Sequence, residues 1–356
     1  MKEVNFSPGP TQLYFTVEDH YKFALKAGYG SISHRSNTFE SIYKHTTTQL
    51  RELLNIPETH HILFTSSATE IWERLIQNLV EQNSFHFVNG AFSEKFYKTS
   101  LQLNREADKQ EVLPGNGFDH IPTVDTELIG ITHNETSTGV SIPTDFIYAL
   151  KDKNPNALLA IDAVSSIPHV DFDYKKVDSV YFSVQKGFGM PPGLGVWIVN
   201  DTCIAKSEYL LGKGHSIGTY NALPNLVKHS RAFQTPQTPN TLAIYVLGKV
   251  AEDLNRRGIG AIRNETQYKA VILGNEIGAH PLLSHFVKEK KFRSSTVLVA
   301  SSGKHTSQIS DMLLAKGIRA GEGYGQGKDQ QLRFANFPSH SKEQFELLVD
   351  YLKAIR

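Results

Sequence analysis

Short apolar runs alternate with longer amphipathic segments through the middle of the chain, and this alternation limits the possible folds more than any other feature. The runs typical of strands are 61–65, 85–88, 128–132, 158–162, 180–184 and 194–199. Helical patterns at 70–79 and 92–103 lie between some of them. Strands that alternate with helices form a largely parallel sheet covered on both faces. We therefore predict an α/β domain, in which ligands bind outside the carboxyl ends of the strands.

The pattern changes after about residue 241. The later segments are a long helix at 241–257, a strand near 295–300, a helix near 307–316, a strand near 331–336 and a terminal helix from Lys342. They predict a smaller α+β domain, and 356 residues suffice for both units. We divide the chain into an N-terminal arm that packs with the small domain (1–14), a large cofactor-binding domain (15–248) and a small C-terminal domain (249–356).

Lys186 and Asp162 carry the most specific chemical implication. Asp162 ends the run 158–162 and Lys186 follows the run 180–184, so both fall at the carboxyl edge of the predicted sheet. A lysine there can form a Schiff base with a carbonyl, and an aspartate nearby can hold a protonated pyridine nitrogen. Either residue alone is weak evidence, because most lysines are surface charges and many aspartates end strands in turns. Together they predict pyridoxal phosphate as the cofactor, with both residues catalytic.

A second motif predicts a phosphate site. Ser67 and Glu70 follow the first strand with the spacing of a capping box that opens a helix. The free amides of a helix N-terminus bind anions, and small residues let the backbone approach. We assign Ala68 and Thr69 to the cofactor phosphate. The alternative is a well-capped helix without a ligand, but its place at the same sheet edge as Lys186 favours the anion site.

Two further residues could surround a pyridine ring. Phe92 follows the strand-like run 85–88 and could stack on the ring, although a core position is an equally good interpretation. Thr136 could donate a hydrogen bond to the ring hydroxyl, although a turn or cap role is as natural. We include both among the cofactor-binding candidates.

Composition excludes several classes of protein. The 37 basic and 36 acidic residues nearly balance, which argues against general binding to nucleic acid or to an anionic membrane. The single cysteine, Cys203, permits no intrachain disulfide and no clustered thiolate metal site, so we assign no metal. Residues 1–6 lack an apolar signal core, and no stretch has the length of a membrane span. We expect a cytoplasmic protein.

The ordered motifs resemble those of class V pyridoxal-phosphate aminotransferases, and within them the phosphoserine aminotransferase family. The matching segments are Asn-Phe-Ser-Pro-Gly-Pro at 5–10, Ser-His-Arg at 33–35, Asn-Glu-Thr at 134–136, Asp-Ala-Val-Ser-Ser at 162–166, Gln-Lys at 185–186 with Gly189, and Gln-Thr-Pro-Asn-Thr at 237–241. These segments span most of the chain in the expected order, so the whole set is far more specific than any single motif. The resemblance implies the fold of type I pyridoxal-phosphate-dependent transferases.

The resemblance also implies roles around the cofactor. Lys186 would bind it covalently and Asp162 would pair with the ring nitrogen. Phe92 stands where the family usually has a stacking tryptophan, Thr136 where a threonine contacts the ring, and Gln185 where a glutamine contacts the phosphate.

Other matching residues concern the substrate and a neighbouring subunit. Gln237 and Thr238 match an Asn-Thr pair that reaches the partner's cofactor phosphate in this family, which implies a homodimer with shared active sites. Arg35 and Arg333 match arginines that hold substrate anions, and His34 lies in the same substrate motif. Arginine suits this task because its planar fork binds a carboxylate bidentately.

The chain departs from the family at two places. Residues 66–70 stand in place of a glycine-rich turn that contains an arginine. The stretch 321–328 lacks a His-Arg pair usual before the second substrate arginine, and Lys328 or His34 could compensate. Fewer fixed cations weaken the argument for a phosphorylated substrate.

We interpret the sequence as an aminotransferase that converts 3-phosphohydroxypyruvate and glutamate to phosphoserine and 2-oxoglutarate. The first alternative is a related enzyme for an unphosphorylated partner such as alanine, serine or glyoxylate. A cysteine desulfurase fits less well, because Cys203 lies outside the late loop in which such an enzyme carries its nucleophile. A non-catalytic protein that binds pyridoxal phosphate is a fourth possibility, disfavoured by the set of Asp162, Lys186 and Arg333.

Overall fold

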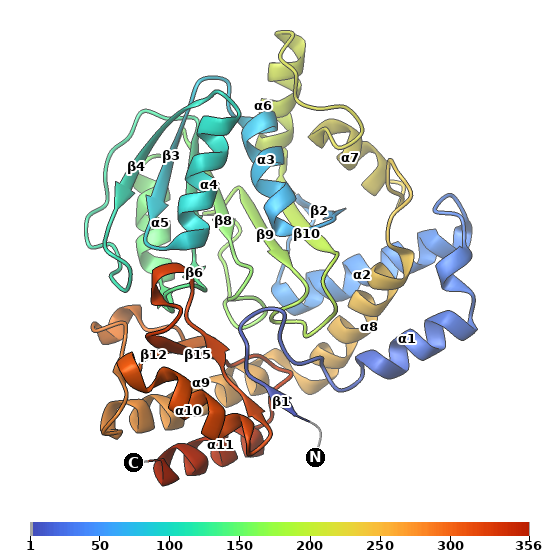
Figure 1. Ribbon diagram of the computed structural model, residues 1–356. Coiled ribbons are helices and arrows are strands. Elements are labelled where there is room, and N and C mark those ends of the chain that lie inside the picture. Colours follow the sequence, from blue (N-terminus) through green and yellow to red (C-terminus); the bar gives the residue numbers. More distant parts are fainter. Residues whose placement is uncertain (1–2, 356) are drawn as a thin grey trace.

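A seven-stranded sheet forms the centre of the large domain in the computed structural model, which describes residues 3–355 (Figure 1). In spatial order its strands are β2 (His60–Thr65), β10 (Gly195–Asn200), β9 (Ser179–Ser183), β8 (Leu158–Asp162), β5 (Leu128–Thr132), β3 (Asn83–Val88) and β4 (Glu106–Glu111). All neighbours pair in parallel except β10, which is antiparallel to both β2 and β9. The predicted α/β fold with a mostly parallel sheet is confirmed.

Both faces of the strands β2, β10, β9, β8 and β5 are covered, which explains their continuous apolar runs. Along β2, Ile62 and Phe64 face one hydrophobic cluster and Leu63 faces the other. The helices on the first face are α2 (Asn37–Leu54), α5 (Thr144–Lys153) and α8 (Thr241–Arg257). Those on the second face are α3 (Ala68–Leu79), α4 (Ala91–Gln102), α6 (Asp201–Gly212) and α7 (Leu223–Ser230). The sheet is therefore the middle layer of three.

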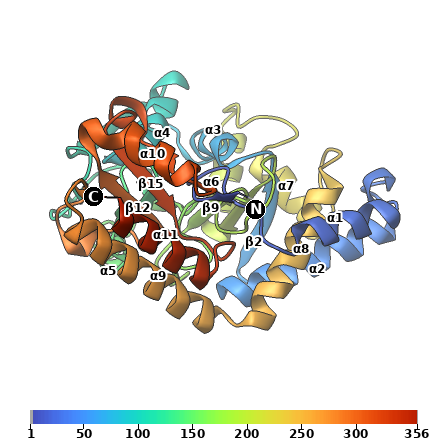
Figure 2. The ribbon, with the colours of Figure 1, turned by 60° about the horizontal axis from the view of Figure 1, so that its bottom comes forward.

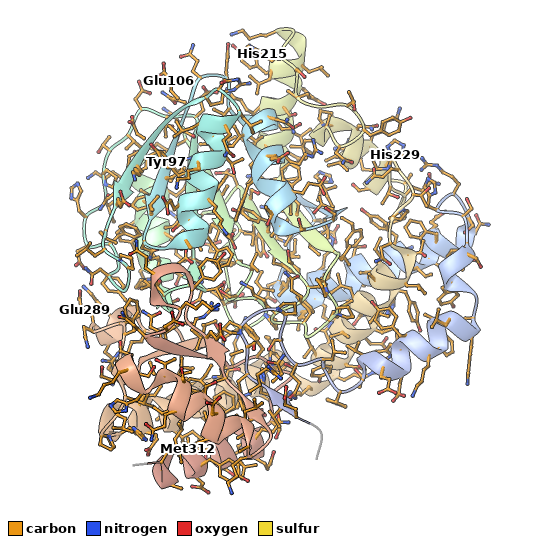
Figure 3. All side chains as sticks on the ribbon, in the orientation of Figure 1. Tyr97, Glu106, His215, His229, Glu289 and Met312 are labelled. Atoms are coloured by element: carbon orange, nitrogen blue, oxygen red, sulfur yellow. The ribbon has the colours of Figure 1, made fainter. Side chains whose placement is uncertain are left out.

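The strand β4 was absent from the sequence prediction. Its residues, Glu-Ala-Asp-Lys-Gln-Glu, are polar and mostly exposed, and Glu106 lies at the outer edge of the molecule (Figure 3). The strand pairs with β3 through its backbone at the end of the sheet. An edge strand of this kind carries no apolar periodicity that a sequence pattern could reveal.

The small domain is built on a second sheet and three helices. Its strand order is β11 (Ser284–His285), β12 (Val297–Ser301), β15 (Gln331–Ala335) and β14 (Gly321–Glu322), all antiparallel. The helices are α9 (Ile259–Ala279), α10 (Thr306–Leu314) and α11 (Lys342–Ala354). Figure 2 shows α9 and α11 side by side next to β12 and β15. These elements share one apolar core.

Short elements complete the chain. They are β1 (Val4–Asn5), α1 (Val17–Lys26), β6 (Asn134–Glu135), β7 (Val140–Ser141), β13 (Ile318–Arg319) and the 3-10 turns η1 (Tyr29–Ser31), η2 (Lys290–Phe292), η3 (Gly303–His305) and η4 (Gly325–Gly327). β1 pairs in parallel with β13 of the small domain, and the fully buried Phe6 stacks on His340 with ring centroids 4.8 Å apart. The arm thus contacts the small domain in its described part; residues 1 and 2 lie outside the description, as does residue 356.

The division between the domains stays a proposal. Residue 248, where the sequence analysis separates large from small, lies inside α8, which continues to Arg257. We place the division within this helix, which packs against α2 on one side and contacts α9 on the other. None of the helices between residues 3 and 355 is both long and apolar enough to cross a membrane.

Candidate active site

Lys186 and Asp162 meet at the carboxyl edge of the large sheet. Asp162 is the last residue of β8, and Lys186 follows the end of the adjacent strand β9 at Ser183. Because β8 and β9 are parallel neighbours, their carboxyl ends project the two side chains into the same region. Both residues are almost entirely buried.

A cavity of about 150 Å³ lies between these two side chains. The predicted cofactor-binding residues that line it are Ala68, Thr69, Phe92, Thr136, Asp162, Gln185 and Lys186. The other lining residues are Gly9, Pro10, Trp72, Thr132, Asn134, Val164 and Ser183. Four strand ends, two helix N-termini and the N-terminal arm therefore enclose one site.

The Lys186 amine is held in an apolar setting with one polar contact. Its Nζ donates a hydrogen bond to Thr136 Oγ1 at 2.7 Å and lies 5.0 Å from the centroid of the Phe92 ring. Burial lowers the pKa of Lys186 to about 8, and the charges of Asp162 and Glu135 oppose this shift. A neutral, nucleophilic amine is therefore accessible at a pH much nearer neutrality than for an exposed lysine.

The Asp162 carboxylate is oriented by two hydrogen bonds. Oδ1 accepts from the backbone amide of Val164 at 3.0 Å, and Oδ2 accepts from Trp72 Nε1 at 3.3 Å. Burial raises the pKa of Asp162 to about 6, while the amide of Val164 and the charge of Lys186 act in the opposite direction. The group is thus a buried anion near neutral pH, suited to a cationic partner.

The turn before α3 brings a helix N-terminus to the cavity. Ser67 is the N-cap, and its Oγ accepts from the amide of Glu70 at 3.2 Å. Glu70 turns back to accept from the amide and the hydroxyl of Ser66 rather than from Ser67. The helix begins at Ala68, whose amide donates to Ser183 Oγ at 2.7 Å. Ala68 and Thr69 are therefore the first two helical residues, in the place that an anion would occupy.

The polar atoms that line the cavity fit pyridoxal phosphate. Three buried oxygens of the cavity-lining residues, Thr132 Oγ1, Asn134 Oδ1 and Gln185 Oε1, have no hydrogen-bond partner within residues 3–355. Unsatisfied buried polar atoms are costly, so a polar ligand would stabilise them. The cavity combines these atoms with a covalent anchor (Lys186), an anion for a ring nitrogen (Asp162), an aromatic face (Phe92) and a helix N-terminus for a phosphate.

Arg333 lies in an adjoining cavity. This second cavity, of about 320 Å³, shares Gly9 with the first and is lined by the arm and the small domain. Arg333 Nε donates to the carbonyl of Glu322 at 2.6 Å and Nη1 to the carbonyl of Thr136 at 3.1 Å. The bond to Thr136 places the guanidinium of the small domain next to the residue that contacts Lys186.

The remaining predicted residues form a separate cluster. Arg35 Nη1 donates to Gln234 Oε1 and to the carbonyl of Thr235, both at 2.8 Å, and Thr238 Oγ1 lies 3.4 Å from His34 Nδ1. His34, Arg35, Gln237 and Thr238 line neither the Lys186 cavity nor the Arg333 cavity within this chain. The structure brings these four residues together but does not bring them to Lys186.

Sequence reasoning missed several residues at the site. Trp72 donates a hydrogen bond to Asp162, and Ser183 accepts one from the first amide of α3. Neither residue belongs to a sequence motif that identifies it. Cys203 is buried in the first turn of α6. Burial raises the pKa of its thiol, which is far from the reactive state of a nucleophilic cysteine.

Comparisons with known proteins show the family and the fold. Residues 4–89 and 94–327 match the family described as Aminotransferase class-V. A solved phosphoserine aminotransferase from Cytophaga hutchinsonii is 47% identical, superposes with a TM-score of 0.97 and is matched over 99% of this chain and 98% of that chain.

More distant relatives extend the comparison. The phosphoserine aminotransferase of Rhodococcus opacus is 26% identical over 323 residues, which are 89% of this chain and 86% of that protein. An aspartate aminotransferase from Thermus thermophilus, 21% identical with a TM-score of 0.85 over 99% of this chain and 100% of that chain, shares the fold. The chain therefore belongs to the class V aminotransferase family and is a pyridoxal-phosphate-dependent transaminase.

Proposed function

We propose that this transaminase transfers the amino group of glutamate to 3-phosphohydroxypyruvate, giving phosphoserine and 2-oxoglutarate for serine biosynthesis. The observation that carries the proposal is the 47% identity, over nearly the whole of both chains, with a protein named phosphoserine aminotransferase. Lys186, Asp162 and Arg333 would serve any amino-acid substrate, because each such substrate has an amino group and an α-carboxylate. They do not by themselves select phosphoserine.

Most of the proposed cofactor contacts come from the residues that line the Lys186 cavity. Lys186 would bind it covalently, Phe92 would stack on its ring, Thr136 would contact the ring hydroxyl, and Ala68, Thr69 and Gln185 would hold its phosphate. When bound, pyridoxal phosphate supplies an electron sink for the bond-breaking at the substrate's α-carbon.

Lys186 then acts as the general acid and base. Its Nζ, with a pKa lowered to about 8, can accept a proton from the α-carbon and return it during amino transfer. Thr136 Oγ1, 2.7 Å away, fixes the direction of the amine. Asp162 keeps a proton on the ring nitrogen, and Trp72 and Val164 hold its carboxylate in place.

Substrate contacts come from both domains and, on our proposal, from a second subunit. Arg333 would bind the substrate α-carboxylate. The cluster of His34, Arg35, Gln237 and Thr238 would reach the active site of the partner in a homodimer, because these residues lie outside the Lys186 cavity of their own chain. A cytoplasmic location remains a prediction from the sequence.

One observation favours a second candidate, a class V transaminase for an unphosphorylated acceptor. The segment 321–328 contains no arginine and no histidine, and Arg319, the other arginine at the Arg333 cavity, pairs with Glu3. This chain therefore has fewer guanidinium groups available to bind a substrate phosphate than the family pattern provides.

A substrate panel separates the two candidates. With glutamate as amino donor, kcat/KM would be measured for 3-phosphohydroxypyruvate, hydroxypyruvate, pyruvate and glyoxylate. We expect 3-phosphohydroxypyruvate to be the best acceptor. If hydroxypyruvate or pyruvate is better, the phosphoserine assignment is wrong and the broader aminotransferase assignment replaces it.

A further inference from the structure

A lysine and a tyrosine join the two domains beside the Lys186 cavity. Lys95 lies in the first half of α4, one turn beyond Phe92, and Tyr324 lies in the small domain between β14 and η4. Lys95 Nζ donates a hydrogen bond to Tyr324 Oη at 2.7 Å. Lys95 has no role assigned above, and Tyr324 lies in the stretch 321–328 that lacks the His-Arg pair.

Both side chains surround the ring predicted to stack on the cofactor. The Phe92 and Tyr324 ring centroids are 5.2 Å apart, and Lys95 Nζ is 5.3 Å from the Phe92 centroid. Lys186 Nζ approaches the same phenyl ring at 5.0 Å. The Lys95–Tyr324 contact therefore shares the Phe92 ring with the reacting amine and lies at the boundary between the domains.

Two cations lie at this contact, and of them Arg333 faces the carboxylates of Glu135 and Glu322. Lys95 forms no ion pair with a carboxylate of residues 3–355, whereas Lys98, one turn further along α4, pairs with Glu94 at 2.6 Å. Arg333 lies on the ring of Tyr324, with its Cζ 5.6 Å from the centroid. The nearby acid Glu322 has its carboxylate 3.7 Å from Lys328. Tyr324 thus stands between two cations, Lys95 and Arg333.

We propose that Lys95 and the hydroxyl of Tyr324 bind the distal anionic group of the substrate, chemically a phosphate monoester, while Arg333 holds the α-carboxylate. This inference rests on the proposed function and names the residues of this chain that select its substrate. A phosphate monoester carries up to two negative charges and three acceptor oxygens, which suit an ammonium group and a hydroxyl donor. Because Tyr324 Oη accepts from Lys95, its own proton is free for donation to the ligand.

The geometry also couples binding to the position of the small domain. Lys95 belongs to the large domain, whereas Tyr324 and Arg333 belong to the small one. A ligand with an anion at each end would contact both domains at once and hold Tyr324 over Phe92. An acceptor that lacks the distal anion would engage Arg333 but neither Lys95 nor Tyr324.

Kinetics of three variants test the assignment on the holoenzyme. We expect Lys95→Gln and Tyr324→Phe to lower kcat/KM for 3-phosphohydroxypyruvate at least about tenfold, the value of one lost charge-assisted hydrogen bond. The same variants should change kcat/KM for hydroxypyruvate, which lacks only the phosphate, by less than about twofold. Lys95→Arg should restore part of the loss, and the matched control Lys98→Gln should affect neither acceptor. An equal loss for both acceptors, or no loss, overturns the proposal.

Binding of an unreactive ligand decides the question without turnover. Titration calorimetry of the holoenzyme with 3-phosphoglycerate and with glycerate measures the contribution of the phosphate alone. We expect the wild type and Lys98→Gln to bind 3-phosphoglycerate at least about tenfold more tightly than glycerate, and Lys95→Gln to lose that margin. If no oxo acid is aminated, the proposed function fails while this binding result still stands. The subsite is eliminated if the wild type and Lys95→Gln bind 3-phosphoglycerate equally tightly. It is also eliminated if the wild type binds 3-phosphoglycerate no more tightly than glycerate.

Discussion

Lys186 and Asp162 have pKa values shifted toward each other by the burial they share. The pKa of the lysine falls to about 8 and that of the aspartate rises to about 6, since removal from water disfavours either charge. Between these values both groups stay charged and attract each other, so the pair persists near neutral pH. The lysine nevertheless loses its proton far more easily than an exposed lysine, and its reaction with a carbonyl requires that loss.

The pH dependence of cofactor attachment follows from this pKa. Because only the neutral amine reacts, the rate of covalent attachment of pyridoxal phosphate to the apoenzyme should rise with pH and level off above about 8. The midpoint should move down in Asp162→Asn, because the carboxylate stabilises the lysine's charge. Stopped-flow absorbance would measure the rates, and borohydride reduction with peptide mapping would locate the attachment. A midpoint near the ordinary 10.5, or a label on another lysine, contradicts the assignment.

A second prediction at this scale concerns the charge of Asp162. Asp162→Asn keeps the size of the side chain but removes the anion that should hold a proton on the ring nitrogen. Transamination should fall at least about a hundredfold, because such electrostatic stabilisation is worth a few kcal/mol in the transition state. Trp72→Phe, which removes one hydrogen bond to the carboxylate without changing charge, should cost about tenfold or less. Near-normal turnover of Asp162→Asn in steady-state assays would eliminate the role.

At the scale of elements, the buried carboxylate of Glu135 fixes the start of α4. It is fully buried and accepts from the amides of Phe92 at 3.1 Å, Ser93 at 2.9 Å and Ser137 at 3.1 Å. Gly90 allows this approach, since a Cβ there would lie 2.4 Å from Glu135 Cγ. A negative charge at a helix N-terminus is favourable. Glu135 thereby ties the helix of Phe92 to the turn of Thr136.

Replacement of this carboxylate should destabilise the fold. In Glu135→Gln a side-chain amide would face backbone amides, and buried donors left unsatisfied cost about 1–3 kcal/mol each. We expect a loss of at least about 2 kcal/mol in the free energy of unfolding, measured by denaturant titration of the apoenzyme. The control Glu94→Gln, an exposed residue of the same first turn that pairs with Lys98, should stay within about 0.5 kcal/mol of wild type. Equal effects of the two substitutions would contradict the capping role.

At the scale of the whole molecule, one chain separates two groups of predicted site residues. Lys186 and its neighbours enclose a cavity, whereas Arg35, Gln237 and their neighbours cluster elsewhere. A two-fold dimer resolves this separation if each subunit places its cluster at the other's cavity. The proposal predicts that each complete active site takes residues from both chains.

Subunit mixing tests this arrangement. Lys186→Ala and Arg35→Ala should each be nearly inactive as pure proteins. After unfolding and refolding together in equal amounts, mixed dimers should contain one intact site, which gives roughly a quarter of wild-type activity. Analytical ultracentrifugation would check that both variants form dimers. A mixture no more active than its components, with mixed dimers present, refutes shared sites.

The sequence by itself determined the layered architecture and the centre of the site. Buried parallel strands are continuous apolar runs, so β5 and β8 were predicted to the residue, and helix α8 likewise. Polar residues that directly follow such runs must lie at the carboxyl edge, which located Asp162 and Lys186. These signals are local, because each depends on residues close together in the chain.

Only the tertiary structure decided which distant residues complete the site. Trp72 reaches Asp162 across 90 positions, and Lys95 meets Tyr324 across 229. The edge strand β4 likewise depends on backbone pairing with β3 rather than on an apolar pattern of its own. Contacts of this kind arise when packing of the sheet and docking of the small domain bring remote segments together. They leave no periodicity in the sequence, because the energy that favours them belongs to pairs of segments and not to either segment alone.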